Sequence, residues 1–374
     1  MLDIPRILVV GYLISSVFLL NSGELRNDQW KGSVTKDKGV EVIKNPKEPL
    51  FKETNSGFEL ELTIRESEST NTFSFARLAS LLVDADGNIY ALDARESNIK
   101  VFSARGQFLR TIGRQGNGPG ELVTPVYMDL FNSTELAVLD AQSRRLTFFG
   151  LNGEYRRSVS TARISMGEMK TDSAGNIYSM VLAIKDDLRR HELQKFDSNL
   201  NYLKTFDFMN IREDRNLTLF VAGPHFTIAE DGLIWYGCPE SEYELKGYTN
   251  EGILVKKIQK IYIPTRIPKA ELEMQTRGVP QGFEVYIPDF YSPYYDIEDD
   301  DNGRIIVLAC MLSKENAYFF DVFNSEGRYI ETKQFRPGHR ASRFRWNKDR
   351  LYVVEEEESG LSVIKVYRIK WAES

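Results

Sequence analysis

Residues 81–93 read LLVDADGNIYALD, residues 98–102 read NIKVF and residues 106–112 read GQFLRTI. The first stretch is an apolar strand, a tight turn at Asp86-Gly87 and a second strand that ends at Asp93. The other two stretches are further short strands, joined by a turn at Arg105-Gly106. Four short antiparallel strands make one blade of a β-propeller, so this segment predicts a blade.

The same pattern returns along the chain and gives six copies in all. The later copies turn at Asn132-Ser133, Ala174-Gly175-Asn176, Asp231-Gly232, Asn302-Gly303 and Lys348-Asp349. The sixth copy supplies only three strands, and Phe58 to Ile64 (FELELTI) alternates like a strand ahead of the first copy. We therefore expect an all-β, six-bladed β-propeller with four-stranded blades, closed into a ring by the N-terminal strand.

Four stretches of the first copy carry a family resemblance: DGNIYALD ending at Asp93, NIKVF, GQFL and GRQGNGPGEL ending at Leu122. Together they resemble an NHL repeat of the six-bladed, TolB-like propellers. The resemblance spans roughly residues 57–371 and implies the propeller fold. It implies little about function, because propellers of this type include binding modules, lactonases, lyases and scaffolds.

Composition limits the class of partner. The chain has 374 residues, of which 42% are hydrophobic and 27% charged, as expected for a globular protein with a large core. Its formal net charge is -6, and it contains no basic run that could neutralise a row of phosphates. A nucleic-acid partner is therefore not expected, and we predict a monomer.

The N-terminus differs from the rest of the chain. Ile7 to Leu20 is almost wholly apolar and follows Arg6, and the small residues Ser22 and Gly23 come next. This pattern predicts a signal peptide over residues 1–23, with an uncleaved N-terminal anchor as the alternative. Residues 24–56 are interpreted as a polar linker and residues 57–374 as the propeller. The protein is thus expected to be exported to the periplasm or to the cell surface and extracellular space, with no membrane contact beyond this N-terminal segment.

An insertion at about residues 264–293 interrupts the spacing of the copies. Lys269 to Arg277 (KAELEMQTR) suits a helix, and an aromatic-rich stretch follows it. A loop of this length is usually functional or disordered, and dense aromatic residues argue against disorder. The aromatic residues either cover an open end of the core or form a docking surface; they are Phe283, Tyr286, Phe290, Tyr291, Tyr294 and Tyr295.

Candidate ligand-binding residues are those expected beside the channel mouth or in the insertion. They are Arg77, His225, Tyr286, Tyr291, Tyr294 and Arg340. Histidine is scarce, and no pair of histidines has metal-ligand spacing, so a zinc site of the usual kind is not expected. No catalytic residue is identified, since the chain has no Gly-x-Ser-x-Gly elbow. The acidic run Glu298 to Asp301 is interpreted as a solvated turn, because its order lacks the spacing of a calcium loop.

Repeated or paired residues elsewhere favour structural roles. Asp93 and Asp140 end equivalent strands, where a carboxylate can accept hydrogen bonds from backbone N–H groups of the next turn. Cys238 and Cys310 lie in neighbouring copies, and we expect two buried thiols there rather than a disulfide, because blades diverge outward.

Two functional hypotheses remain. The first is a non-catalytic, exported binding or scaffold propeller that recognises a protein, peptide or glycan. The alternative is a metal-dependent hydrolase or lyase with its site at the central channel, because loops distant in sequence can bring carboxylates together there. No cofactor is indicated, although a central divalent ion such as calcium stays open.

Overall fold

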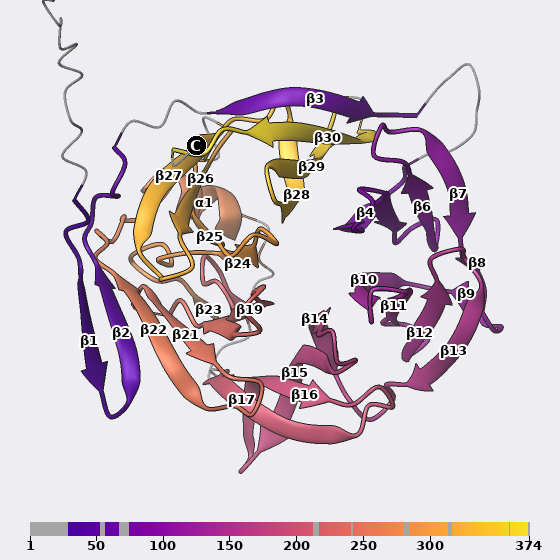
Figure 1. Ribbon diagram of the computed structural model, residues 1–374, viewed down its shortest axis with the longest axis horizontal. Helices are drawn as coiled ribbons and strands as arrows, with labels where there is room; N and C mark the ends of the chain where they lie inside the picture. The colour runs from indigo at the N-terminus through magenta and orange to yellow at the C-terminus, as the bar shows by residue number, and fades with distance from the viewer. Residues whose placement is uncertain are drawn as a thin grey trace, which may run out of the picture.

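The computed structural model describes residues 29–52, 57–66, 75–211, 217–240, 242–277, 279, 284–312, 316–358 and 360–372. Six four-stranded antiparallel units are arranged around a central channel, as Figure 1 shows. The predicted six-bladed β-propeller is therefore confirmed. The predicted signal peptide lies outside the described residues. Within them, no helix has the length and apolar character needed to cross a bilayer.

Each blade runs from an inner strand at the channel to an outer strand at the rim. The first blade contains β4 (Leu78–Val83), β5 (Ile89–Asp93), β6 (Asn98–Phe102) and β7 (Phe108–Ile112). The second contains β10 (Pro125–Phe131), β11 (Glu135–Asp140), β12 (Arg145–Gly150) and β13 (Tyr155–Ser160). The third contains β14 (Met166–Thr171), β15 (Ile177–Lys185), β16 (Leu188–Phe196) and β17 (Tyr202–Asn210).

The remaining three blades follow the same order. The fourth contains β19 (His225–Ile228), β20 (Ile234–Gly237), β21 (Glu244–Tyr248) and β22 (Leu254–Lys260). The fifth contains β24 (Asp296–Asp299), β25 (Ile305–Leu312), β26 (Ala317–Phe323) and β27 (Tyr329–Phe335). The sixth contains β28 (Arg340–Asn347), β29 (Arg350–Glu356), β30 (Ser362–Ile369) and β3 (Phe58–Ile64).

Ring closure depends on β3. This strand pairs antiparallel with β30, with Phe58 opposite Ile369 and Ile64 opposite Ile364. The chain's N-terminal part thus supplies the outer strand of the last blade, as predicted. Because the pairing satisfies the free edge of β30, it removes a strand edge that could otherwise recruit another chain.

The repeated sequence forms the first hairpin of a blade for a specific reason. In the first blade, Asp84 Oδ2 accepts hydrogen bonds from Asn88 Nδ2 at 2.9 Å and from the Tyr90 hydroxyl at 3.0 Å. Asp172 does the same with the corresponding asparagine and tyrosine of the third blade. Gly87 takes a φ of 79° in the turn, a left-handed conformation that glycine adopts at little cost.

The carboxylates at the ends of the second strands are structural, as expected. Asp93 accepts hydrogen bonds from the amides of Arg95 and Glu96 in the following turn, and from Ala76 and Arg77 in the incoming connector. Asp140 makes the equivalent bonds in the second blade. Each carboxylate therefore fixes the chain where it enters and leaves the inner part of its blade.

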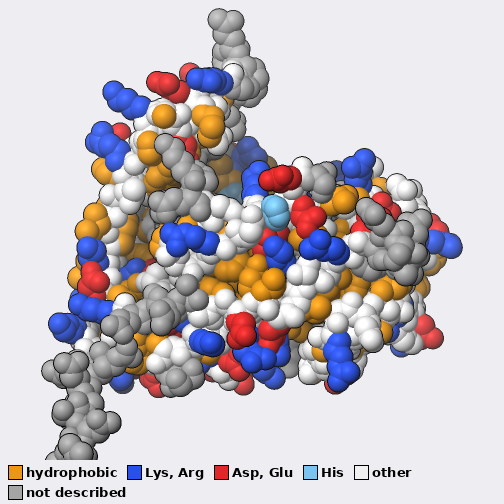
Figure 2. All heavy atoms as spheres, turned by 90° about the horizontal axis from the view of Figure 1, so that it is seen from above, with side chains coloured by type: hydrophobic (Ala, Val, Ile, Leu, Met, Phe, Trp, Pro, Cys, Tyr) orange, Lys and Arg blue, Asp and Glu red, His pale blue; other side chains and the backbone are white. Residues whose placement is uncertain are grey.

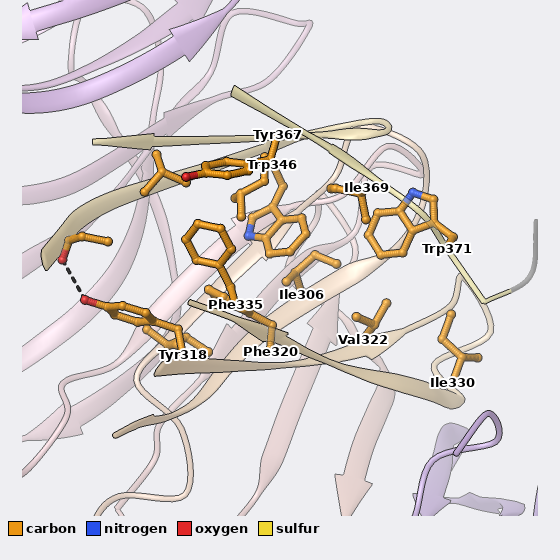
Figure 3. Packing of buried hydrophobic residues seen from close by; sticks show 14 residues of the cluster. Ile306, Tyr318, Phe320, Val322, Ile330, Phe335, Trp346, Tyr367, Ile369 and Trp371 are labelled. Atoms are coloured by element: carbon orange, nitrogen blue, oxygen red, sulfur yellow. Dashed lines mark hydrogen bonds between the residues drawn. The ribbon is translucent and has the colours of Figure 1, made fainter. Parts of the chain in front are cut away.

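The apolar core lies between blades. Among the described residues, one buried cluster occupies each of the six boundaries between neighbouring blades. Figure 3 shows the cluster between the fifth and sixth blades, where the rings of Phe320 and Trp346 meet edge to face with centroids 5.1 Å apart. Burial of apolar area at every boundary, including the one sealed by β3, stabilises the closed ring as a whole.

The expected linker over residues 24–56 is wrong where the structure describes it. β1 (Ser33–Asp37) and β2 (Val40–Asn45) form a hairpin, and β2 pairs in parallel with β22 of the fourth blade. The amides of Leu50 and Phe51 then donate to carbonyls of β27 in the fifth blade. The segment therefore binds the outer edges of three consecutive blades, with β3 as its last element (Figure 1). Val40, Val42 and Ile43 around the Lys38-Gly39 turn are the apolar signal for this hairpin.

The insertion contains the predicted helix, α1 (Lys269–Thr276). A short parallel pair, β8 (Arg114–Gln115) and β9 (Glu121–Leu122), shapes the connector between the first two blades. In the insertion, beyond the helix, β23 (Val285–Tyr286) forms another parallel pair with β18 (Leu217–Thr218), which lies between the third and fourth blades. The pairing of β23 with β18 ties the insertion to the connector between the third and fourth blades.

Candidate functional site

Polar side chains from consecutive inner strands line one end of the central channel. A cavity of about 490 Å³ opens there. Its upper layer contains Tyr127 of β10, Glu168 of β14, His225 of β19, Asp296 of β24 and Arg343 of β28. Alternate residues of a strand share a face, so side chains two positions farther along form a second layer. That layer comprises Asp129, Lys170, Glu298 and Arg345.

Three members of the upper layer converge on one point. His225 Nδ1 lies 3.4 Å from Glu168 Oε2 and 3.4 Å from Asp296 Oδ1. One coordinating atom from each residue lies within 4.8 Å of the others, and all three side chains are half-buried. We call Glu168, His225 and Asp296 the channel triad. Its members come from three consecutive blades, so the ring itself holds them together.

Electrostatics in the channel triad favour a proton on the imidazole. Burial opposes protonation of His225, but the hydrogen bond to Glu168 and the charges of Asp296 and Glu298 outweigh it and raise the pKa to about 9. Burial raises the pKa of Asp296, while the positive charge of His225 lowers it in part. An imidazolium held between two carboxylates is therefore the favoured state near neutral pH.

The second layer is an ion-pair network beneath the channel triad. Arg345 lies 3.4 Å from Glu298 and 2.9 Å from Asp301. Burial raises the pKa of Glu298 to about 7, against the charges of Lys170 and Arg345. The interpretation of residues 298–301 as a solvated turn is wrong, because Asp299 and Asp300 are buried, and their carboxylates bind Thr227 and Arg304.

Blades two and six provide the other polar groups at the mouth. The Arg343 guanidinium donates from Nε to the carbonyl of Ala79 at 2.7 Å, and this bond joins the side chain to β4 of the first blade. Burial and the charge of Glu168 raise the pKa of Tyr127, whose phenol therefore stays neutral. Blade one contributes Ala79, Ser80, Leu81 and Leu82 to the lining, so it supplies no charged side chain to the cavity.

A second cavity, of about 650 Å³, lies under the insertion. We call it the insertion cavity. Aromatic rings and proline rings form much of its wall, together with the polar residues His191, Asn210, Glu240, Asp289 and Ser292. Its aromatic members are Tyr262, Tyr286, Phe290 and Tyr291. No lysine or arginine lines it among the described residues, and burial lowers the pKa of His191, so the wall carries negative charge.

The insertion cavity and the channel mouth are neighbours. The amide of Ala222 donates to Ser292 Oγ at 3.0 Å, which joins the connector that enters β19 to the connector that enters β24. Both residues line the insertion cavity, and within a few residues each connector reaches a member of the channel triad. The two cavities therefore lie close to the same pair of connectors.

The predicted ligand-binding residues divide into two groups. His225 lines the channel cavity, and Tyr286 and Tyr291 line the insertion cavity. Arg77 and Arg340 are exposed at the starts of inner strands and line neither of these cavities. In the sixth blade, Arg343, three residues beyond Arg340, reaches the channel instead.

Tyr294 requires a correction. Its ring is fully buried between the fourth and fifth blades, and its hydroxyl donates to the Glu244 carbonyl at 2.9 Å. A ring in this position cannot contact a ligand, so its predicted role in binding is wrong. Phe283 lies outside the described residues.

Cys238 lines neither the channel cavity nor the insertion cavity. Cys238 is a free, half-buried thiol, and burial raises its pKa to about 11. A thiol with a raised pKa is a poor nucleophile near neutral pH. The side chain of Cys310 lies outside the described residues.

Sequence comparison places the chain in a family defined by this fold. Residues 68–257, about half of the chain, match the family described as DUF5128: 6-bladed beta-propeller. The chain belongs to this family. The curated proteins include no sequence that matches it.

Two solved structures share the fold of this DUF5128 propeller. A Bacteroides fragilis protein thought to be exported matches with a TM-score of 0.57 and 14% identity, over 88% of this chain and 100% of that one. A member of the DUF4221 family from Bacteroides vulgatus matches with a TM-score of 0.52 and 12% identity, over 85% and 100% of the two chains. Similarity at this level of identity shows the fold alone.

Proposed function

We propose that this DUF5128 propeller is an exported binding protein that recognises a protein, peptide or glycan at the face shared by the insertion cavity and the channel mouth. The observation that carries the proposal is the insertion cavity itself. Its volume of about 650 Å³ falls within the range of about 300–1,000 Å³ typical of small-molecule sites.

The composition of the wall supports recognition of a ligand. Tyrosine and phenylalanine rings give contact area at small entropic cost, while a few polar groups fix orientation. Phe290 is 42% exposed, which is high for a large aromatic side chain, and its ring lies 5.6 Å from the Arg266 guanidinium. Phe290 can therefore contact a ligand without first leaving the core.

The proposal is tested with glycan and peptide arrays, on which wild type and Phe290→Ala protein are compared. We expect wild type to select a defined class of probe and Phe290→Ala to bind it at least about tenfold more weakly, as for an interface anchor. Tyr155→Ala is the matched control, since Tyr155 is equally exposed but lies on β13 of the second blade. Equal binding by wild type and Phe290→Ala would contradict the proposal.

A second candidate function, a metal-dependent hydrolase or lyase, is favoured by the channel triad. One imidazole and two carboxylates around a point offer both acid–base groups and metal ligands. Its test is turnover of a panel of esters, lactones and uronate-containing saccharides with added divalent ions. Activity that is retained in His225→Gln would exclude the channel triad as its source.

A further inference from the structure

The coordinating atoms of the channel triad are arranged at distances that suit a metal ion. In a tetrahedral site with bonds of about 2.1 Å, neighbouring ligand atoms are separated by about 3.4 Å. His225 Nδ1 lies 3.4 Å from Glu168 Oε2 and 3.4 Å from Asp296 Oδ1. An ion between these atoms would therefore need little movement of the backbone or of the side chains.

We propose that Glu168, His225 and Asp296 bind one divalent transition-metal ion, of the zinc or manganese type, at the mouth of the channel. The ligand set decides the class of metal. Imidazole nitrogen suits zinc and other first-row transition metals, whereas calcium and magnesium favour oxygen ligands throughout. The structure therefore points away from the calcium ion considered from the sequence.

Three protein ligands leave coordination positions open to the channel cavity. Catalytic zinc sites have this pattern, with a water or substrate in the remaining position, whereas structural sites are closed by four protein ligands. Tyr127 and Arg343 border the same cavity. An anionic group bound to the ion would thus meet the Arg343 guanidinium, which carries the complementary charge.

A proton is the competitor of the metal. Coordination through Nδ1 requires an unprotonated nitrogen, so a proton on the imidazole of His225 competes with the ion. Other charged groups that line the cavity come from β10, β14, β24 and β28. They are Asp129, Lys170, Glu298, Arg343 and Arg345, with Tyr127 neutral.

The inference does not rest on recognition at the insertion cavity, because the two cavities share no lining residue. The experiment is equilibrium dialysis of chelator-treated protein against ZnCl₂, MnCl₂ or CaCl₂, with bound metal measured by mass spectrometry. We expect about one zinc or manganese ion per chain and little calcium. Loss of a residue that only hydrogen-bonds to a metal ligand typically weakens metal affinity by roughly 10–100-fold. Because His225→Ala removes a ligand itself, it should weaken metal affinity by more than this.

His191→Ala is the matched control, since it removes a histidine from the insertion cavity and should leave metal uptake unchanged. If His225→Ala does not fold, Glu168→Gln removes one ligand while keeping the side chain's shape and should lower the affinity too. Absence of stoichiometric uptake, or uptake that both triad variants retain, overturns the proposal. Stronger binding of calcium than of zinc and manganese overturns the assigned class of ion.

Discussion

His225 Nδ1 lies 3.4 Å from Glu168 Oε2, although the two residues are contributed by inner strands of different blades. Asp296 reaches the same imidazole from a third blade. The short distances within the channel triad depend on the closed ring, because each of the three inner strands contributes only one of its members. Closure of the propeller and the chemistry at its channel are therefore coupled properties.

His225 should titrate at a far higher pH than His191, which is also half-buried. With its folded pKa raised to about 9, His225 stays protonated through neutral pH, whereas burial lowers the pKa of His191 below 6.5. The chain has three histidines, so their imidazole resonances can be followed individually by NMR, with assignment by substitution. A midpoint for His225 at or below 6.5 in metal-free protein would contradict the description of the channel triad.

The same shift gives stability a pH dependence. Because the folded pKa of His225 exceeds its unfolded value, the stabilisation is fully present below about pH 6.5 and is lost as pH rises through about 9. The contribution is measured as the difference in unfolding free energy between wild type and His225→Gln, obtained by urea unfolding at pH 6.5 and pH 9.5. This difference should be smaller by about 1–3 kcal/mol at pH 9.5. An unchanged difference would contradict the assignment.

Sequence patterns could predict the ring because its determinants are local. Turn residues, alternating strands and the Asp93-type carboxylates each act within one blade, so one sequence copy contains the information for one blade. His225 could be placed beside the channel mouth because it begins the inner strand of the fourth blade. The same reasoning applied to the starts of β14 and β24 leads to Glu168 and Asp296, which lie near the beginnings of those inner strands.

The position of Arg343, the distances across the channel and the β1–β2 hairpin could not be predicted from local sequence patterns. Arg343 follows a β-bulge in β28, between Ala341 and Arg343, so its face could not be found by counting along the strand. Distances across the channel also depend on ring closure, which no single strand encodes. The hairpin of β1 and β2 was missed because its partner, β22, is more than 200 residues away in the chain.

Deletion of Phe58 to Ile64 should open the ring. The change removes β3 and leaves β30 with an unpaired edge beside the apolar cluster that contains Ile64 and Ile364. We expect a lower melting temperature and loss of soluble monomer, measured by calorimetry and size-exclusion chromatography with light scattering. Deletion of Ser33 to Asn45 is the control. Because β22 stays paired with β21, this deletion should lower the melting temperature and the yield of soluble monomer by less. Equal effects of the two deletions would argue against closure by β3.

Two glycines that flank the candidate site should respond differently to alanine. A Cβ at Gly237 would lie 2.5 Å from Ile297 Cδ1 and 2.5 Å from the Tyr294 hydroxyl, both in the buried core, whereas nothing lies within 4 Å of one at Gly223. Gly237→Ala should cost about 1–3 kcal/mol of unfolding free energy, and Gly223→Ala less than about 0.5 kcal/mol. Chemical denaturation of both variants checks this, and a tolerated Gly237→Ala would contradict the packing around Tyr294.

Few interactions within helix α1 itself stabilise it. It spans eight residues, buries none of them and begins after Pro268 without a side-chain cap. Isolated helices shorter than about 12–15 residues are marginal in water, so tertiary contacts must hold it. One such contact is the hydrogen bond at 2.6 Å from the Tyr291 hydroxyl to Glu271 Oε2, which ties the helix to the wall of the insertion cavity.

Tyr291→Phe should therefore loosen α1 while leaving the propeller intact. The ring stays against Phe220, its edge-to-face partner, and the hydrogen bond from its hydroxyl to Glu271 is lost. Hydrogen exchange followed by mass spectrometry should show faster exchange in residues 269–276, with unchanged exchange in the blades and a melting temperature within a few degrees of wild type. Tyr286→Phe is the control, since its ring lines the same cavity from β23. If Tyr291→Phe leaves exchange in α1 unchanged, the hydrogen bond to Glu271 is not what holds the helix over the cavity, and other contacts of the insertion must do so.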